Sequence, residues 1–547
     1  MDTSAVGQDG QSIPSANLTR PASDTPQEVE LRLLAEPAAL DALDQDEALQ
    51  AGTTGAVKHK HQVGTYFDTE DRRMRRRGVD FRVRRIGNSF VQTVKAKGGD
   101  QAGPLSRNEW ETAITGPEPD LAALAGVGAA EVTGVLLPGD LHPLFVTDVR
   151  RTVRTVAYDA GGKNASLIEV AADRGAVRLA GGAEDETSTP ISELELELKA
   201  GKPDALFDLA LALNERHAVR VGFAGKADRG YALLSGKQAG PQTAAKVALQ
   251  PDWTVDQSMG SVFRACFSHW IANEKPAELG SDPEGVHQLR VSLRRLRTAL
   301  SLFSPALSEL DRTWLGGEAK WLAGSLGPAR DWDVFIGEMM PDIAEAGYEQ
   351  ELAPLLAAAE ARQKDAYAQV REVIGSPRYT RLLLEFWRWL EGNGWRSTGL
   401  EMQRQPVVAL ADQVLAKQQK RVLKKGRGFA KLSLPDRHEV RIAVKKLRYS
   451  VEFFASLFPG EKSKRYRRRL SGLQDALGAM NDAAVADTLL DQVVGAMRPG
   501  KAAVPLARAA GLVSGWYTRG RIDEDAELVA SWQAFRRAKP FWHDLSS

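Results

Sequence analysis

Several segments in the first 235 residues repeat charged side chains of one sign at every second position. In 28–32 and again in 193–199, glutamates alternate with apolar residues, and in 80–84 arginines do the same. Because successive side chains of a β-strand point to opposite faces, each segment gathers its charges on one strand face. Carboxylates and guanidinium groups on facing strands would together suit a divalent cation and an anion rich in phosphate oxygens.

These charged faces allow two interpretations. A strand can turn such a face to water, which is the simpler explanation for any one strand. The pattern recurs, however, in several strands, with glutamates on some and cations on others, so we favour a closed sheet with the charges inside. Buried charges cost free energy unless they are paired or bind a ligand. A polyanion together with Mg²⁺ or Mn²⁺ would satisfy both signs.

Alternating apolar and polar residues predict the strands that carry these faces. The expected strands are 28–33, 80–84, 90–97, 107–114, 146–158, 166–172 and 193–199. A helix is expected at 203–216, where apolar residues recur at helical spacing. The region 27–235 is therefore predicted to be an antiparallel α+β domain.

Short motifs in this region resemble the CYTH domain of the triphosphate tunnel metalloenzymes. In chain order they are Glu28-Val29-Glu30-Leu31-Arg32, Tyr66-Phe67-Asp68-Thr69, Gly78 with Arg82 and Arg84, Gln92-Thr93-Val94-Lys95, Arg107-Asn108-Glu109-Trp110-Glu111, Glu169 with Asp173-Arg174-Gly175, the alternating segment 193–199, and Lys226 with Arg229-Gly230-Tyr231. The family signature E-x-E-x-K has lysine where this chain has Arg32, which keeps the charge but changes the geometry of a phosphate contact. The resemblance implies a tunnel barrel of eight antiparallel strands that hydrolyses or cyclises triphosphates with divalent metal.

The resemblance also implies roles for individual residues. Metal would be bound by Glu28, Glu30, Glu195 and Glu197. Phosphate groups would be held by Arg32, Arg82, Arg84, Lys95, Arg107, Arg151 and Lys226. Water would attack a terminal phosphorus while the metal offsets charge on the bridging oxygens. Either Glu169 or Glu111, across the lumen, would orient that water, and the sequence leaves both open.

The second part of the chain contains a duplicated basic segment. His287 and His438 are each followed by basic residues at +3, +7, +8 and +10 and by apolar residues at +2, +6 and +9, at an offset of 438 − 287 = 151. The same offset relates Leu326-Gly327 to Leu477-Gly478. Two matching blocks at one offset indicate a repeated helical unit.

On a helix, the histidine and the basic residues at +3, +7 and +10 fall in one stripe beside the apolar face, at about 100° per residue. The stripes are His287, Arg290, Arg294 and Arg297, and His438, Arg441, Lys445 and Arg448. Like charges four residues apart repel, and solvated helix faces usually mix signs. Two cationic stripes therefore favour an anionic partner over a solvated face. A histidine beside a core is as readily a hydrogen-bonded structural residue as a ligand.

Residues 255–540 resemble the CHAD domain, the conserved-histidine α-helical domain often found after CYTH, in the two basic segments and the Leu-Gly blocks that follow them. The resemblance implies two four-helix subunits related by a pseudo-two-fold axis, with a basic surface that binds inorganic polyphosphate. Nucleic acid is the competing polyanion, but base stacking calls for aromatic residues among the cations, and the stripes contain none. Nucleic acid is therefore the less favoured partner.

Length and composition agree with a two-domain chain, because 547 residues exceed one hydrophobic core. We expect a disordered leader at 1–26, a strand domain at 27–235, a linker at 236–252 and an all-α duplicated bundle at 253–547. The net charge of +1, from 72 basic and 71 acidic residues, does not by itself indicate an anionic partner. The single cysteine, Cys266, allows no internal disulfide, and no apolar run reaches the roughly 20 residues of a membrane span. A cytoplasmic protein with no membrane partner is expected.

Together these patterns predict a Mg²⁺- or Mn²⁺-dependent triphosphatase acting on inorganic tripolyphosphate or short polyphosphate. The helical domain would bind polyphosphate, and would either feed the tunnel or tether the enzyme to polyphosphate granules. A nucleoside or thiamine triphosphatase, or an adenylate cyclase, is the alternative among enzymes. A polyphosphate-binding protein whose tunnel only holds a ligand is the alternative outside enzymes.

Overall fold

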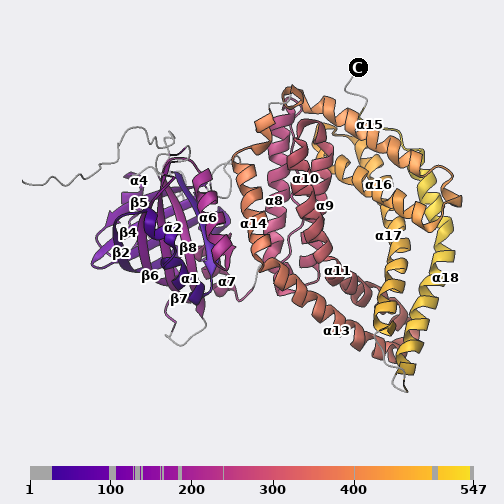
Figure 1. The fold of residues 1–547 in the computed structure, drawn as a ribbon, viewed down its shortest axis with the longest axis horizontal. Helices are drawn as coiled ribbons and strands as arrows, with labels where there is room; N and C mark the ends of the chain where they lie inside the picture. The colour runs from indigo at the N-terminus through magenta and orange to yellow at the C-terminus, as the bar shows by residue number, and fades with distance from the viewer. Residues whose placement is uncertain are drawn as a thin grey trace, which may run out of the picture. The chain divides into compact units, whose positions relative to one another are not determined.

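The computed structural model describes two compact units, which meet in the sequence at residues 238 and 239 (Figure 1). The described residues are 27–97, 106–126, 129, 136, 139–159, 162, 165–182, 188–237, 240–398, 401–495, 500 and 503–542. The predicted leader, 1–26, lies outside them.

The first unit is built on one antiparallel sheet. Its strands are β1 (Gln27–Ala35), β2 (Thr53–Asp68), β3 (Val79–Ile86), β4 (Ser89–Lys97), β5 (Ser106–Ile114), β6 (His142–Tyr158), β7 (Ser166–Leu179), β8 (Ser188–Ala200) and β9 (Val219–Val221). They lie in the order β5-β4-β3-β2-β6-β7-β8-β1-β9, and β1 also pairs with β5. The pairing of β1 with β5 extends over Gln27–Val29 and Ser106–Asn108. It closes the eight strands from β1 through β8 into a ring.

The structure adds two strands to those expected from the sequence. The short β9 pairs with the end of β1, so the sheet has nine strands and not the eight expected. The long β2 escaped prediction because residues 55–61 are exposed and lack an apolar alternation. That part of β2 pairs with β6, whereas its pairing with β3 begins only at Gln62.

Helices and hydrophobic clusters cover the sheet. The helices of this unit are α1 (Pro37–Asp44), α2 (Glu47–Gly52), α3 (Arg73–Arg76), α4 (Leu121–Gly126), α6 (Asp204–Arg216) and α7 (Lys226–Ser235). One hydrophobic cluster contains Phe145, Val149 and Tyr231. Phe145 and Val149 lie on the same face of β6 as Arg151. Aromatic and aliphatic side chains from β6 and α7 therefore fill part of the face that also carries charge.

The second unit is helical. Its helices are α8 (Val255–Leu279), α9 (Glu284–Leu302), α10 (Glu309–Ser325), α11 (Gly327–Val334), α12 (Met340–Ile343), α13 (Glu349–Ile374), α14 (Pro377–Glu391), α15 (Val407–Lys425), α16 (Leu434–Phe453), α17 (Glu461–Gly495) and α18 (Ala503–Arg536). The predicted basic segments lie on α9 and α16, which pack against each other.

The duplication is visible in the helices, with one difference. The Leu-Gly block at Leu326-Gly327 separates α10 from α11, whereas its counterpart Leu477-Gly478 lies inside the single long helix α17. Pro328 follows the first block and Ala479 the second. Because proline lacks a backbone N–H and cannot continue a preceding helix, its presence accounts for the break in the first copy alone.

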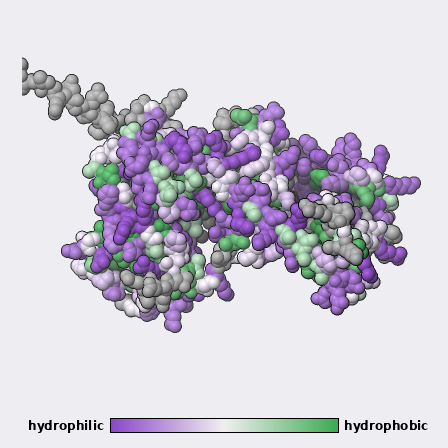
Figure 2. Space-filling model, turned by 60° about the horizontal axis from the view of Figure 1, so that its bottom comes forward, coloured by the Kyte–Doolittle hydropathy of each residue, from purple (hydrophilic) through white to green (hydrophobic). Residues whose placement is uncertain are grey.

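The surface carries few large hydrophobic side chains. On the face drawn in Figure 2, hydrophobic residues lie scattered among hydrophilic ones. Among the described residues, no helix is long and apolar enough to cross a membrane.

Candidate active site and anion-binding surface

Strand register brings the alternating charges of the first unit together on one face. Glu195 of β8 lies directly opposite Arg32 of β1. One step along, Glu197 is opposite both Glu30 of β1 and Glu169 of β7. Directly opposed side chains in a sheet have Cβ atoms about 4.5–5.5 Å apart, so these residues form adjoining rows.

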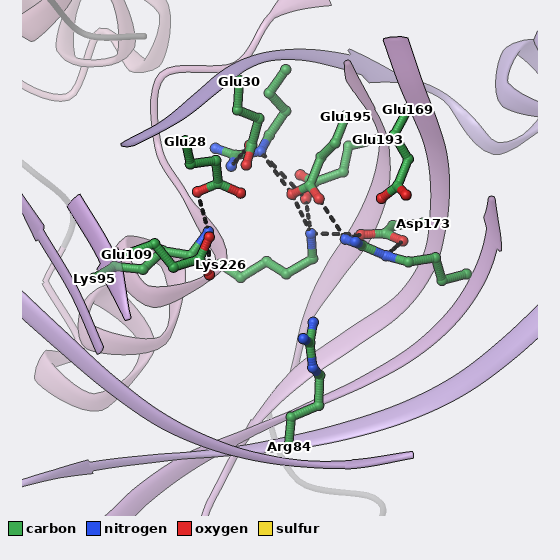
Figure 3. A network of polar contacts seen from close by, with 12 residues as sticks. Glu28, Glu30, Arg84, Lys95, Glu109, Glu169, Asp173, Glu193, Glu195 and Lys226 are labelled. Carbon is green, nitrogen blue, oxygen red and sulfur yellow. Dashed lines mark hydrogen bonds and ion pairs between the residues drawn. The ribbon is translucent and has the colours of Figure 1, made fainter. Parts of the chain in front are cut away.

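A cluster of three carboxylates surrounds one ammonium group at the buried end of this face. Asp173, Glu193 and Glu195 each offer an oxygen within 4.8 Å of the others, a spacing that could hold a metal ion. Lys226, at the first turn of α7, places its Nζ 2.7 Å from Asp173 Oδ2 and 2.7 Å from Glu195 Oε1, and also contacts Glu193. Figure 3 shows the ammonium pointing into the three carboxylates.

Arginines complete this cluster. Arg151 donates to Asp173 from Nε at 2.7 Å and from Nη2 at 2.6 Å, and also contacts Glu195. Arg32 lies 3.4 Å from Glu195 and 3.5 Å from Glu193, and it contacts Glu30. Arg229 also contacts Glu193.

The cations decide the ionisation of this buried cluster. The side chains of Asp173 and Glu193 are fully buried. Burial raises the pKa of Glu195, but Lys226, Arg151 and Arg32 outweigh burial and hold that pKa well below its usual range. Lys226 and Arg32 do the same for the pKa of Glu193. Glu193 and Glu195 are therefore ionised, and the whole cluster is already paired with cationic side chains of the protein.

The neighbouring row of Glu30, Glu197 and Glu169 has fewer cations. Burial and the nearby Glu195 raise the pKa of Glu30 despite Arg32. Burial also raises the pKa of Glu197 and outweighs the effect of Lys199, which lies 2.5 Å away; the charges of Glu28 and Glu169 act in the same direction as burial. Carboxylates that face one another across strands without enough positive charge destabilise the sheet. This row therefore fits a divalent cation better than the cluster around Lys226 does.

Two arginines on β3, Arg82 and Arg84, share one direct carboxylate contact, which Arg84 makes with Glu111. Arg82 is half-buried and has no ion-pair partner among the described residues, and its Nε has no hydrogen-bond partner. Burial lowers its pKa, but Tyr66, Glu109 and Glu111 outweigh burial and raise it. Arg84 donates to Glu111 at 3.0 Å, and its pKa is lowered to about 10 by Arg82 and by burial. Two guanidinium groups that repel each other inside a protein form a site for an anion.

The remaining predicted residues lie around these groups. Lys95 lies 2.5 Å from Glu28 and 3.3 Å from Glu109. Glu111 accepts a hydrogen bond from Thr93 at 2.9 Å. Burial raises the pKa of Glu111, but Arg84 and Thr93 outweigh burial, so that this pKa is lowered overall. The backbone of Arg107 pairs with Glu28, but its side chain lies outside the described residues.

The structure therefore brings the predicted carboxylates and cations together, with two changes of emphasis. Arg32 and Lys226, predicted to hold phosphate, are bound by carboxylates of the protein. Asp173, Glu193, Glu109 and Arg229 belong to the network but were absent from the predicted site. Alternation had already placed Glu193 on the same face as Glu195, so it was within reach of the sequence; the β7–β8 register that brings in Asp173 was not.

In the helical unit, the first stripe is partly committed to protein contacts. Arg290 donates from Nη1 to the backbone oxygen of Ala323 at 2.6 Å, and Arg294 donates to the Tyr449 hydroxyl at 3.3 Å. His287 is half-buried, and burial together with Arg330 lowers its pKa to about 4. Arg297 is exposed.

The second stripe has one exposed member and three half-buried ones, as the first has. His438 is exposed, and Arg441 and Lys445 are half-buried. Arg448 lies 2.7 Å from Glu452 on its own helix. The two stripes thus share a sequence pattern, and they differ in which member is exposed, Arg297 in the first and His438 in the second.

Comparison with known proteins identifies the domain type of each unit. Residues 26–231 match the family model of the CYTH domain, and residues 261–491 match that of the CHAD domain, which confirms the resemblance predicted from the motifs. The inorganic triphosphatase of Haemophilus influenzae is 32% identical over 213 residues, which are 39% of this chain; the chain spans 56% of the length of that relative.

Solved structures resemble each unit separately. The CHAD domain from the plant Ricinus communis is 27% identical and covers 55% of this chain and 98% of its own, with a TM-score of 0.49. HpAC1 from Hippeastrum, described as an adenylyl cyclase candidate with a dominant triphosphatase activity, is 18% identical and covers 39% of this chain and 97% of its own, with a TM-score of 0.28.

Proposed function

Because the chain has a CYTH domain followed by a CHAD domain, we propose that it is a metal-dependent inorganic triphosphatase whose helical domain binds polyphosphate. One observation carries the proposal. The inner face of the strand unit has an excess of carboxylate along Glu30, Glu197 and Glu169, and an excess of guanidinium at Arg82 and Arg84. A metal–triphosphate complex is a ligand that supplies the missing charge to both sides.

The carboxylate row would hold the metal. Glu28, Glu30, Glu195 and Glu197 were predicted as ligands, and Glu195 is the member most committed to protein cations. Hard carboxylate oxygens suit Mg²⁺ or Mn²⁺. When bound, the metal would act as a Lewis acid on the phosphoryl oxygens.

The arginines would bind and orient the substrate. Arg82 and Arg84 present guanidinium groups that can each make two parallel hydrogen bonds to phosphate oxygens. Their mutual repulsion is relieved when the anion binds, and Glu111 keeps Arg84 in place through its contact at 3.0 Å. The repulsion between Arg82 and Arg84 therefore favours binding of the substrate anion.

Of the two candidates for orienting water, we favour Glu169. It lies directly opposite Glu197, next to the glutamates proposed as metal ligands. Glu111 is instead hydrogen-bonded to Thr93 and Arg84. Glu169 would accept a hydrogen bond from the water that attacks the terminal phosphorus, while Glu111 positions an arginine.

The helical domain would hold the substrate polymer. The half-buried cations of the stripe on α16 and the exposed Arg297 on α9 suit a phosphate chain. The role proposed for this domain is to keep polyphosphate close to the enzyme or to bind the enzyme to polyphosphate bodies in the cytoplasm.

A phosphate-release assay tests the activity. The full chain is incubated with tripolyphosphate, ATP, thiamine triphosphate or long-chain polyphosphate, each with Mg²⁺, Mn²⁺ or chelator. We expect metal-dependent release that is fastest from tripolyphosphate. Equal release with chelator would contradict the metal role, and preference for ATP or thiamine triphosphate would replace the proposed substrate.

A further inference from the structure

On one side of the contact between α9 and α16, a carboxylate bridges the two basic helices. Glu452 lies 3.2 Å from Arg295 of α9 and 2.7 Å from Arg448 of α16. Arg295 is largely buried, and its guanidinium lies 4.6 Å from the centre of the Phe453 ring. Both arginines therefore have an internal anion.

The repeat predicts a second copy of this arrangement. At the offset of 151, Arg295 corresponds to Lys446 and Arg448 corresponds to Arg297. The position of Glu452 corresponds to Ser301. The second copy thus has both cations and no carboxylate to bridge them.

The cations of the second copy lie on adjoining helices, because α16 packs against both α9 and α15. Burial, together with the charges of Arg421 and Arg297, lowers the pKa of Lys446, and Lys425 acts in the same direction. Among the described residues, Arg297, Arg421 and Lys446 have no ion-pair partner. The nearby carboxylate, Glu439, lies 2.8 Å from Lys425 and is itself exposed.

The helix beside each copy differs in the same sense. In the first repeat α8 packs on α9, and it carries two basic and three acidic residues. In the second repeat α15 packs on α16, and it carries five basic residues and one acidic residue. The five cations are Lys417, Lys420, Arg421, Lys424 and Lys425. Like charges three and four residues apart on one helix repel, which an anionic ligand would offset.

We propose that Arg297, Arg421 and Lys446 form an oxyanion site that takes a phosphoryl group of inorganic polyphosphate, at the place equivalent to the Glu452 carboxylate. The site rests on the proposed polyphosphate binding by the helical domain and makes that binding unequal between the two repeats. Carboxylate and phosphate oxygens accept the same hydrogen bonds from guanidinium and ammonium groups. Glu452 therefore shows which chemistry the second copy lacks.

Installing the missing carboxylate tests the site. Ser301→Glu should give the second copy the anion that Glu452 gives the first, and Ser301→Gln is the neutral control of similar size. Binding of the full chain to polyphosphate of defined medium length is measured by titration calorimetry without added divalent metal. We expect Ser301→Glu to weaken binding about two- to fivefold and Ser301→Gln to leave it unchanged.

A second pair of variants checks the cations directly. Arg421→Ala with Lys446→Ala should weaken binding by at least as much as Ser301→Glu. Arg468→Ala with Arg469→Ala removes the same charge from the exposed face of α17 and should have a smaller effect. If wild type binds and Ser301→Glu matches Ser301→Gln, the oxyanion site is wrong while the proposed function stands. If wild type does not bind polyphosphate, both are wrong.

Discussion

The inner face of the strand unit and the basic helices of the second unit differ in which charged side chains they bring together. On the strands, carboxylates and cations share one face, and the most buried group is neutralised by the protein itself, as Lys226 does for Asp173 and Glu193. On α16, the stripe contains cations and a histidine but no carboxylate of its own. A site with both signs can bind a metal and an anion together, whereas a site with one sign can only hold the anion.

The same contrast appears within the strand unit on a smaller scale. Cations of the protein neutralise the cluster around Lys226, which is therefore complete without a ligand. They do not neutralise the row of Glu30, Glu197 and Glu169, which is therefore incomplete. Buried ion pairs add little net stability but are costly to break. We therefore expect the complete cluster to support the fold and the incomplete row to support activity, and the two can be separated by substitution.

Removing the central ammonium should have the largest effect. Lys226→Met leaves Asp173, Glu193 and Glu195 with less positive charge in a buried site, which should cost about 3–5 kcal/mol of unfolding free energy. Urea denaturation of the purified chain, followed by circular dichroism, measures the loss. Lys237→Met removes an exposed lysine just beyond the same helix and should change stability by less than about 0.5 kcal/mol. Equal stability of the two variants would contradict a structural role for the cluster.

Neutralising the incomplete row should have the reverse signature. Glu197→Gln removes a carboxylate whose pKa is raised by burial and by Glu28 and Glu169, so the metal-free protein should be as stable as wild type or more stable. Activity on tripolyphosphate should fall by roughly 10–100-fold, with a higher metal concentration needed for half-maximal rate. Glu118→Gln, at an exposed position, serves as the control.

This double readout separates metal binding from folding. A loss of activity accompanied by a matching loss of metal-free stability would make Glu197 a structural residue. Activity unchanged at low metal concentration would remove it from the metal site.

The sequence predicted the faces of the strands but not their neighbours. Alternation placed Glu28, Glu30, Glu195 and Glu197 on shared faces because the side-chain period of a strand is two. Which cation faces which carboxylate depends on register between distant strands, and that is set by pairing over the whole sheet. Arg32 shows the consequence, since it lies opposite Glu195 and is held by carboxylates.

The helical repeat shows a similar limit. The offset identified both stripes, but it could not show that Arg290 is committed to a backbone oxygen, because Ala323 lies on another helix. It also could not rank the repeats. The basic residues on α15 belong to no repeated motif, so the repeat does not predict a role for them. Their closeness to the second stripe follows from the packing of α15 on α16.

The second stripe is expected to contribute to polyphosphate binding through Arg441 and Lys445. Arg441→Ala with Lys445→Ala should weaken binding about three- to tenfold, and the slope of log affinity against log salt should fall in magnitude by about 1–2. Titrations at several salt concentrations measure both. Arg290→Ala should mainly lower stability, because it removes a hydrogen bond to Ala323. Unchanged affinity and salt slope after the double substitution would contradict binding at the second stripe.

The two histidines of the repeat should differ in how they affect stability at low pH. Burial and Arg330 lower the pKa of His287 to about 4, below its usual value near 6.5. Above about pH 6.5 His287 is neutral in both states and contributes nothing. As the pH falls from 6.5 toward 4 the unfolded chain binds the proton more readily, so the folded state loses stability. Replacing His287 by Gln should remove this loss, and the melting temperature of that variant should fall by about 2–4 °C less than wild type between pH 7 and pH 5. His438→Gln is the matched control because His438 is exposed at the equivalent position; if both variants shift the pH profile equally, burial at His287 is not the cause.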